Sequence, residues 1–290
     1  MNQLTTYRWS FEEDLHHCRH AGYDGIAVWV RKLRDFGEER AAELISDSGL
    51  AVSNVSWEGG FTGADAVTSR ENLAAARDTL ALCGALGAGC LTIYSGGRNG
   101  HTSRHANRLL RAALDRLLPF AEEAGVPLAI EPMHPACADD WTIVTSLPDA
   151  LELVREYDTP ALRLALDTYH FPLAEEAWPI LRELAGYLAV VHLGDVQTPH
   201  SVDHSRAALG EGAAPLAGIV QTLAEAGYAG FFDVKLLGPA FDEADYDRLL
   251  RQSREAFVAF GADEIAAVEV APRDAAAPTP SPIDSCKLIW

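Results

Sequence analysis

Three short apolar runs follow one another in the centre of the chain: Pro127-Leu-Ala-Ile-Glu-Pro132, Leu162-Arg-Leu-Ala-Leu-Asp167 and Leu188-Ala-Val-Val-His-Leu-Gly-Asp195. Each run has the length of a buried β-strand and carries a charged or imidazole side chain at or near its end. A longer segment with the apolar spacing of a helix follows each run. Strands that alternate with helices in this way are typical of a parallel sheet covered by helices.

The same alternation extends to both ends of the chain. Eight strands are predicted, at residues 4–9, 25–30, 51–57, 90–95, 127–132, 162–167, 188–195 and 230–237. The helix after the first strand opens with a capping box, Ser10-x-x-Glu13. A doubly wound sheet usually has a glycine-rich phosphate turn after its first strand, and Trp9-Ser10-Phe11 is not such a turn. Eight strand–helix units therefore predict a closed α/β barrel, the (β/α)8 or TIM barrel.

One domain is expected to fill residues 1–261. Residues 262–290 are rich in alanine and proline, so we expect a C-terminal tail without fixed structure. Docking of its apolar last residues onto the barrel or onto a partner is the alternative.

Charge and composition exclude several classes of partner. The chain has 23 basic and 42 acidic residues, a formal net charge of −19, whereas nucleic-acid binding requires a basic surface. The sequence contains no apolar run of the ~18 residues that a membrane span needs. Its five cysteines are scattered and form no CxxC pair, which favours reduced thiols. We therefore expect a cytoplasmic protein that binds neither nucleic acid nor membrane.

Polar side chains lie at the ends of the last four predicted strands: Glu131, Asp167, His192 and Lys235. The alternation of side chains along a strand predicts that Asp233 and these four residues point into the barrel. Two carboxylates and an imidazole at one rim suit a divalent cation that prefers oxygen and nitrogen ligands. Ordinary salt bridges are the alternative for each residue alone, but three on consecutive strands favour a metal site.

Aromatic residues lie at the ends of the first strands. Trp9, Trp29 and Trp57 close the first three, and Tyr94 closes the fourth. Aromatic faces opposite a polar cluster suit a ligand with an apolar CH face and many hydroxyl groups, such as a sugar or cyclitol. Packing of these rings against rim loops is the alternative.

The motifs resemble those of the xylose isomerase-like TIM barrels, a superfamily of sugar phosphate isomerases and epimerases, inosose and dehydroshikimate dehydratases and the endonuclease IV branch. The resemblance covers roughly residues 1–260 and is weak for any one reaction. It rests on Glu131-Pro-Met-His-Pro135, Asp167-Thr-Tyr-His170, His192-Leu-Gly-Asp195, the segment from Arg206 to Gly210-Glu-Gly212, and Gly230-x-x-x-Val-x-Leu236.

The resemblance implies roles for individual residues. Glu131, Asp167 and His192 would bind a divalent metal ion: manganese, cobalt, magnesium or zinc. The resemblance also implies substrate contacts by His170 and Arg206. His101 resembles a residue of the family's substrate-side loop, although a surface histidine is the alternative. His134 would contact substrate or support Glu131.

Lys235 departs from the family pattern, which has a glutamate as fourth metal ligand at this position. An ammonium group cannot bind a metal ion. Three hypotheses follow: a three-ligand metal site with Lys235 as proton shuttle or oxyanion donor, an ammonium that replaces the metal, or an inactive site retained for binding. Asp233 would pair with Lys235 or substitute in part for the missing carboxylate.

The function favoured by the resemblance is an isomerase or epimerase of a small polyhydroxylated substrate. A metal would polarise the carbonyl, and Glu131, with Lys235 acting opposite it and His170 nearby, would move the proton through an enediolate. A dehydratase or lyase, an inactive binding protein and a Schiff-base aldolase built on Lys235 are the alternatives. Arg206 is the only arginine in the loops between the last two predicted strands, which favours a non-phosphorylated ligand. Related barrels often form homo-oligomers, so the resemblance also implies self-association.

Overall fold

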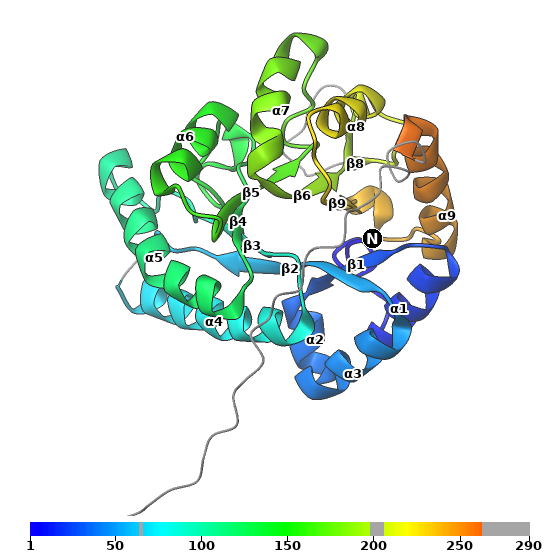
Figure 1. The fold of residues 1–290 in the computed structure, drawn as a ribbon, viewed down its shortest axis with the longest axis horizontal. Coiled ribbons are helices and arrows are strands. Elements are labelled where there is room, and N and C mark those ends of the chain that lie inside the picture. Colours follow the sequence, from blue (N-terminus) through cyan, green and yellow to red (C-terminus); the bar gives the residue numbers. More distant parts are fainter. Residues whose placement is uncertain (64–65, 198–205, 263–290) are drawn as a thin grey trace, which may run out of the picture.

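A computed structural model of the chain describes residues 1–63, 66–197 and 206–262. Within these residues, seven parallel strands form one sheet in the order β1-β2-β3-β4-β5-β6-β9. Figure 1 shows this sheet curved into a barrel with helices around its outside. The strands are β1 Gly25–Trp29, β2 Ala51–Gly59, β3 Leu91–Tyr94, β4 Leu128–Ile130, β5 Leu162–Asp167, β6 Leu188–Leu193 and β9 Phe231–Val234. The predicted TIM barrel is confirmed.

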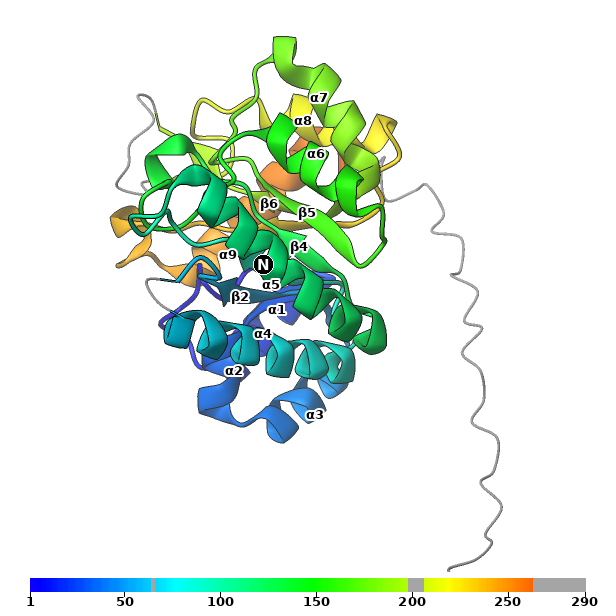
Figure 2. The same cartoon turned by 90° about the vertical axis from the view of Figure 1, so that its left-hand side faces the viewer.

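The helices cover the outer face of the sheet. They are α1 Phe11–His20, α2 Val30–Phe36, α3 Glu38–Ser48, α4 Ala66–Leu86, α5 Ser103–Ala124, α6 Leu147–Tyr157, α7 Trp178–Leu184, α8 Leu216–Glu225 and α9 Tyr246–Phe257. Figure 2 shows α4 and α5 side by side on this outer surface. The Ser10–Glu13 capping box forms as predicted, and Gly49 and Gly125 end their helices in the left-handed conformation.

The first predicted strand, residues 4–9, is wrong. Met1 to Gln3 lie between β9 and β1 instead: Asn2 N–H donates to Val234 O at 3.0 Å, and Gln3 N–H donates to Ala27 O at 3.0 Å. The chain then turns, because the Asn2 side chain accepts a 3.0 Å hydrogen bond from Leu4 N–H. Three residues therefore close the barrel where six were expected.

The interior of the barrel is separate from the layer between sheet and helices. Cys90, Ala129, Ala165 and Val190 form a small apolar cluster inside, with Phe231 packed against it. Their neighbours along the strands, including Leu128, Leu166 and Val191, belong to the large core beneath the helices. The predicted alternation is therefore confirmed, and it turns Glu131, Asp167, His192 and Lys235 inward above the small cluster.

Shorter elements complete the description. A two-stranded antiparallel ladder, β7 Asp195–Val196 with β8 Arg206–Ala207, lies after β6. Single turns span Pro135–Cys137, Glu175–Ala177, Ala185–Tyr187, Pro239–Phe241 and Val258–Ala262. None of the helices in the described residues combines the length and apolar character needed to cross a bilayer. The expected tail at 262–290 lies, apart from its first residue, outside the described residues.

Candidate active site at the carboxyl ends of the strands

Glu131, Asp167 and His192 meet at the carboxyl ends of three neighbouring strands. Glu131 directly follows β4, while Asp167 of β5 pairs in register with His192 of β6. One oxygen or nitrogen of each side chain lies within 4.8 Å of the corresponding atoms of the other two, and all three residues are buried. The predicted convergence of these three residues is therefore present in the structure.

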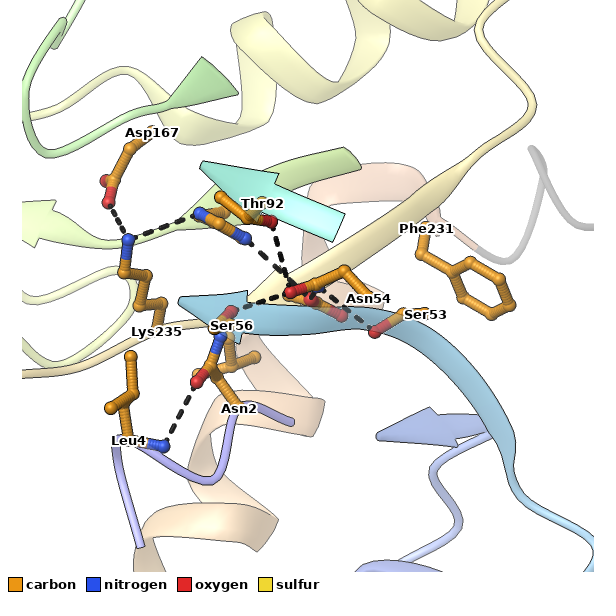
Figure 3. A network of polar contacts seen from close by, with 12 residues as sticks. Asn2, Leu4, Ser53, Asn54, Ser56, Thr92, Asp167, Phe231 and Lys235 are labelled. Atoms are coloured by element: carbon orange, nitrogen blue, oxygen red, sulfur yellow. Dashed lines mark hydrogen bonds and ion pairs between the residues drawn. The ribbon is translucent and has the colours of Figure 1, made fainter. Parts of the chain in front are cut away.

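Lys235 reaches into the centre of this group. Its Nζ donates a 2.6 Å hydrogen bond to Glu131 Oε1 and lies 3.2 Å from Asp167 Oδ2 and 3.3 Å from His192 Nδ1. Figure 3 shows the contact between Lys235 and Asp167. The lysine is 1% exposed, so the ammonium depends on these groups for its solvation. Lys235 was expected to act opposite Glu131, but the two side chains are in direct contact.

Arg206 binds the second carboxylate. Its guanidinium donates to both oxygens of Asp167, at 2.8 and 2.9 Å, and lies 4.3 Å from the centre of the Tyr169 ring. The β7–β8 ladder brings Arg206 to this position. A Cβ atom at Gly194 would lie 2.2 Å from Arg206 Nη1, so the guanidinium requires a glycine there.

Asp195 holds the segment that follows Arg206. Its carboxylate accepts four backbone N–H groups at 2.8 to 3.0 Å, from Val196, Gly210, Gly212 and Ala214. Hydrogen bonds of this kind to an ionised acceptor are strong, so Asp195 fixes the loop on which Arg206 depends. The Gly210-Glu-Gly212 motif therefore wraps around an aspartate and supports the site indirectly.

The charges of the cluster balance. Burial raises the pKa of Glu131, but the Lys235 ammonium and His192 outweigh this effect and bring the pKa to about 2. Burial acts on Asp167 as well, where the Arg206 guanidinium and Lys235 hold the pKa well below its usual range. Burial lowers the pKa of His170 to about 3, so its imidazole is neutral near pH 7. Two carboxylates thus face two cations.

A divalent metal ion would need the donor atoms at the centre of this cluster. In donor type and spacing, Glu131, Asp167 and His192 are compatible with such an ion. Lys235 Nζ, however, lies among their donor atoms, and Arg206 occupies both oxygens of Asp167. The residues in this arrangement therefore do not fit a resident divalent ion.

Asp233 does not pair with Lys235. It lies deeper in the barrel, where it accepts a hydrogen bond from Asn54 of β2. Asn54 Oδ1 in turn accepts from Ser56 Oγ at 2.7 Å and Thr92 Oγ1 at 3.3 Å (Figure 3). This polar layer separates the charged cluster from the apolar base of the barrel. One sequence pattern indicated this polar layer: Asn54 and Ser56 are two residues apart on β2, so their side chains point to the same face of the sheet.

The aromatic residues divide into two groups. Trp57 lies beside the cluster, with Lys235 Nζ 5.1 Å from its ring centre, and it stacks on Trp141 at 5.3 Å. Tyr94 completes this group, 5.0 Å from Trp57. Trp9, by contrast, stacks on His17 of α1 at 4.4 Å and meets Tyr246 of α9.

Three other predicted residues are placed by local contacts. Trp29 is half-buried at the end of β1, and its backbone N–H donates to Gln3 Oε1 at 2.9 Å. His101 Nε2 lies 3.2 and 3.1 Å from the carbonyl oxygens of Thr62 and Gly63. His134 Nδ1 accepts a hydrogen bond from Ala136 N–H, which caps the turn after β4.

Trp141 was missed by sequence analysis because it lies in the loop after β4, where no strand pattern exposes it. Trp141 is 37% exposed. It stacks on Trp57, and Trp57 lies beside the buried cluster. Its place in a loop at the carboxyl face was the available signal.

Comparison with known proteins agrees with this fold. Residues 15–257 match the family model described as xylose isomerase-like TIM barrel. Among solved structures, protein SMc04130 from Sinorhizobium meliloti 1021 is 25% identical, with a TM-score of 0.84 over 89% of this chain and 96% of that chain. The IolI protein, solved with a zinc atom, is 20% identical (TM-score 0.79, 91% and 97% covered).

An L-ribulose 3-epimerase structure is also similar, at 23% identity and a TM-score of 0.75 over 91% of this chain and 94% of that chain. No curated protein sequence matches the chain. The match of the family model over most of the barrel establishes the family. The chain belongs to the xylose isomerase-like TIM barrel family.

Proposed function

We propose that this protein is an isomerase or epimerase that moves a proton next to the carbonyl group of a small sugar or cyclitol. The observation that carries the proposal is the buried Glu131–Lys235 pair, a carboxylate hydrogen-bonded to an ammonium at 2.6 Å at the strand ends of a barrel. The similarity to an L-ribulose 3-epimerase supports the proposal.

Glu131 is the base in this proposal. Its Oε2 is buried and accepts no hydrogen bond from the described residues, whereas its Oε1 is held by Lys235. Asp167 is a weaker candidate, because Arg206 and Lys235 contact both of its oxygens. The α-proton passes to Glu131 Oε2, and the electron pair of the C–H bond forms the carbon–carbon double bond of an enediolate.

Lys235 stabilises the negative charge that develops on the carbonyl oxygen. An ammonium fixed in a water-poor site interacts with such a charge more strongly than in water, without having to reorient. His170, neutral and with its Nδ1 unpaired among the described residues, is available to bind a substrate hydroxyl. The Trp57–Trp141 stack offers an apolar surface for the CH face of the ring.

A single available carboxylate favours proton return on the same face. Glu131 can pass its proton to the neighbouring carbon while the proton of the adjacent hydroxyl moves to the former carbonyl oxygen, and the two transfers together interconvert an aldose and a ketose. Epimerisation instead needs a proton donor on the opposite face of the enediolate. Of the two reactions, isomerisation is therefore the one that the Glu131–Lys235 contact supports better.

Proton exchange with solvent tests the proposal. The protein is incubated in D2O with a panel of aldoses, ketoses and cyclitol ketones, and NMR follows the C–H signal beside the carbonyl. We expect deuterium incorporation and an isomer for at least one compound. Glu131→Gln should slow deuterium incorporation about 10²–10⁴-fold. Glu176→Gln, a control at an exposed residue, should leave the rate unchanged. Binding without exchange across the panel would indicate a binding protein instead.

A further inference from the structure

The ammonium of Lys235 lies where a cation shared by the cluster would lie. Its three nearest partners are Glu131 Oε1, Asp167 Oδ2 and His192 Nδ1, at 2.6, 3.2 and 3.3 Å. These residues are also the group whose spacing suits a metal ion. We infer that the Lys235 ammonium takes the place of a divalent ion, so that the cluster is complete without metal.

The charge balance supports this inference. Glu131 and Asp167 supply two negative charges, and Lys235 and Arg206 supply two positive charges. Asp233, a further buried carboxylate, accepts a hydrogen bond from Asn54 and lies 4.0 Å from His192 Nε2. A divalent ion added to this buried group would leave positive charge in excess, and uncompensated charge in a protein interior is costly.

The position of the lysine is also fixed. Its backbone N–H donates to Leu193 O at 2.9 Å, which continues the β6–β9 ladder. Its side chain is 2% exposed, and its Nζ lies 5.1 Å from the Trp57 ring centre. Any ion that displaced the ammonium would leave it buried without its carboxylate partners. Lys235 therefore competes with a metal ion for the same ligands.

A single substitution that removes the ammonium of Lys235 should therefore create a metal site. Lys235→Glu would add a third carboxylate to Glu131, Asp167 and His192, a donor set suited to a divalent ion. Lys235→Met would remove the ammonium from among the same three ligands and keep an unbranched side chain. Asp167 would stay bound to Arg206, and its oxygens would offer an ion their remaining lone pairs. Lys235→Arg would retain the positive charge and should continue to exclude the ion.

Metal content and thermal unfolding test the inference without any substrate. The full-length wild type and the three variants are stripped with chelator, dialysed against MnCl2 or ZnCl2 and analysed for bound metal. We expect wild type and Lys235→Arg to retain no stoichiometric metal and to show no rise in Tm. Lys235→Glu and Lys235→Met should bind about one ion per chain, with a rise in Tm that Glu131→Ala abolishes in each background.

Stoichiometric metal in the wild type, lost in Glu131→Ala, would overturn the inference. So would a folded Lys235→Glu and Lys235→Met pair that binds no metal, because the lysine would then not be what excludes the ion. Calorimetric titration of the wild type with MnCl2 gives a readout that does not depend on any variant folding. These outcomes are independent of turnover, so failure of the proposed isomerase activity would leave them unchanged.

Discussion

Lys235 and Glu131, 104 positions apart in the sequence, are joined by a 2.6 Å hydrogen bond inside the barrel. Each follows a strand at its carboxyl end, β9 for the lysine and β4 for the glutamate. The bond spans the interior of the barrel between these strands and balances the negative charge of the carboxylate that the proposed chemistry uses. Its consequences for stability can be measured separately from those for activity.

Removal of the ammonium should destabilise the fold. Lys235→Met leaves Glu131 without its cation, and the loss of one partner of a buried ion pair typically costs about 3–5 kcal/mol. Urea unfolding in chelator measures this loss. Arg182→Met is the control, because its ion pair with Glu225 spans 4.0 Å at the surface and should contribute below ~1 kcal/mol. Equal effects of the two substitutions would contradict the account.

Gly194 should tolerate no side chain. An added Cβ would meet Arg206 Nη1 at 2.2 Å, so Gly194→Ala must push the guanidinium away from Asp167. We expect a loss of about 2–4 kcal/mol, near that for breaking a buried ion pair, together with a large fall in activity. Gly186→Ala is the matched control, since a Cβ there meets no atom within 4 Å. Thermal unfolding of both variants measures their losses of stability, and only Gly194→Ala should show a large one.

The pH dependence of stability should depend on Asp14. Burial raises the pKa of this carboxyl to about 6, although Lys32 and Thr6 contact it at 2.6 Å. The native state therefore holds a proton between about pH 4, the usual pKa of an unfolded aspartate, and pH 6. As the pH rises through this range, wild type should lose up to about 3 kcal/mol relative to Asp14→Asn.

Urea unfolding of both proteins at several pH values checks this prediction. The comparison with Asp14→Asn cancels the contributions of other groups, including His170, whose lowered pKa acts in the opposite direction. A constant difference between the two proteins from pH 4 to pH 6 would show that Asp14 keeps an ordinary pKa.

Trp141 should serve binding more than stability. It is 37% exposed and stacks on Trp57, so Trp141→Ala should unfold at nearly the wild-type temperature. For a sugar identified by the exchange assay, we expect KM to rise about 5–30-fold, the effect of losing about 1–2 kcal/mol of ring contact. Phe120→Ala, an exposed aromatic residue of α5, is the control. A KM unchanged in Trp141→Ala would remove the ring from the substrate site.

Much of the site was accessible from sequence because strand periodicity determines side-chain direction. Glu131, Asp167 and His192 share one parity on consecutive strands, and parallel strands end at one rim, so their convergence follows from the pattern. The same reasoning failed at residues 4–9, where the capture of Leu4 N–H by Asn2 ends the strand after three residues. A local side-chain hydrogen bond of that kind leaves no periodic signal.

Contacts that depend on side-chain length and loops were not accessible. Alternation places Lys235 inside the barrel, but it does not say whether the ammonium faces Glu131 across a substrate or touches it directly. Trp9 was expected at the site on the basis of the strand over 4–9, and it packs against α1 and α9 because that strand does not form. Trp141 lies in a loop, whose path no periodicity defines.

Anomalous diffraction from crystals soaked in manganese tests the central claim most directly, because it locates the cation of the site. The account predicts no anomalous peak among Glu131, Asp167 and His192, and electron density for Lys235 that ends within hydrogen-bond distance of Glu131. A strong manganese peak bound by those three residues, with Lys235 turned away from them, would contradict it.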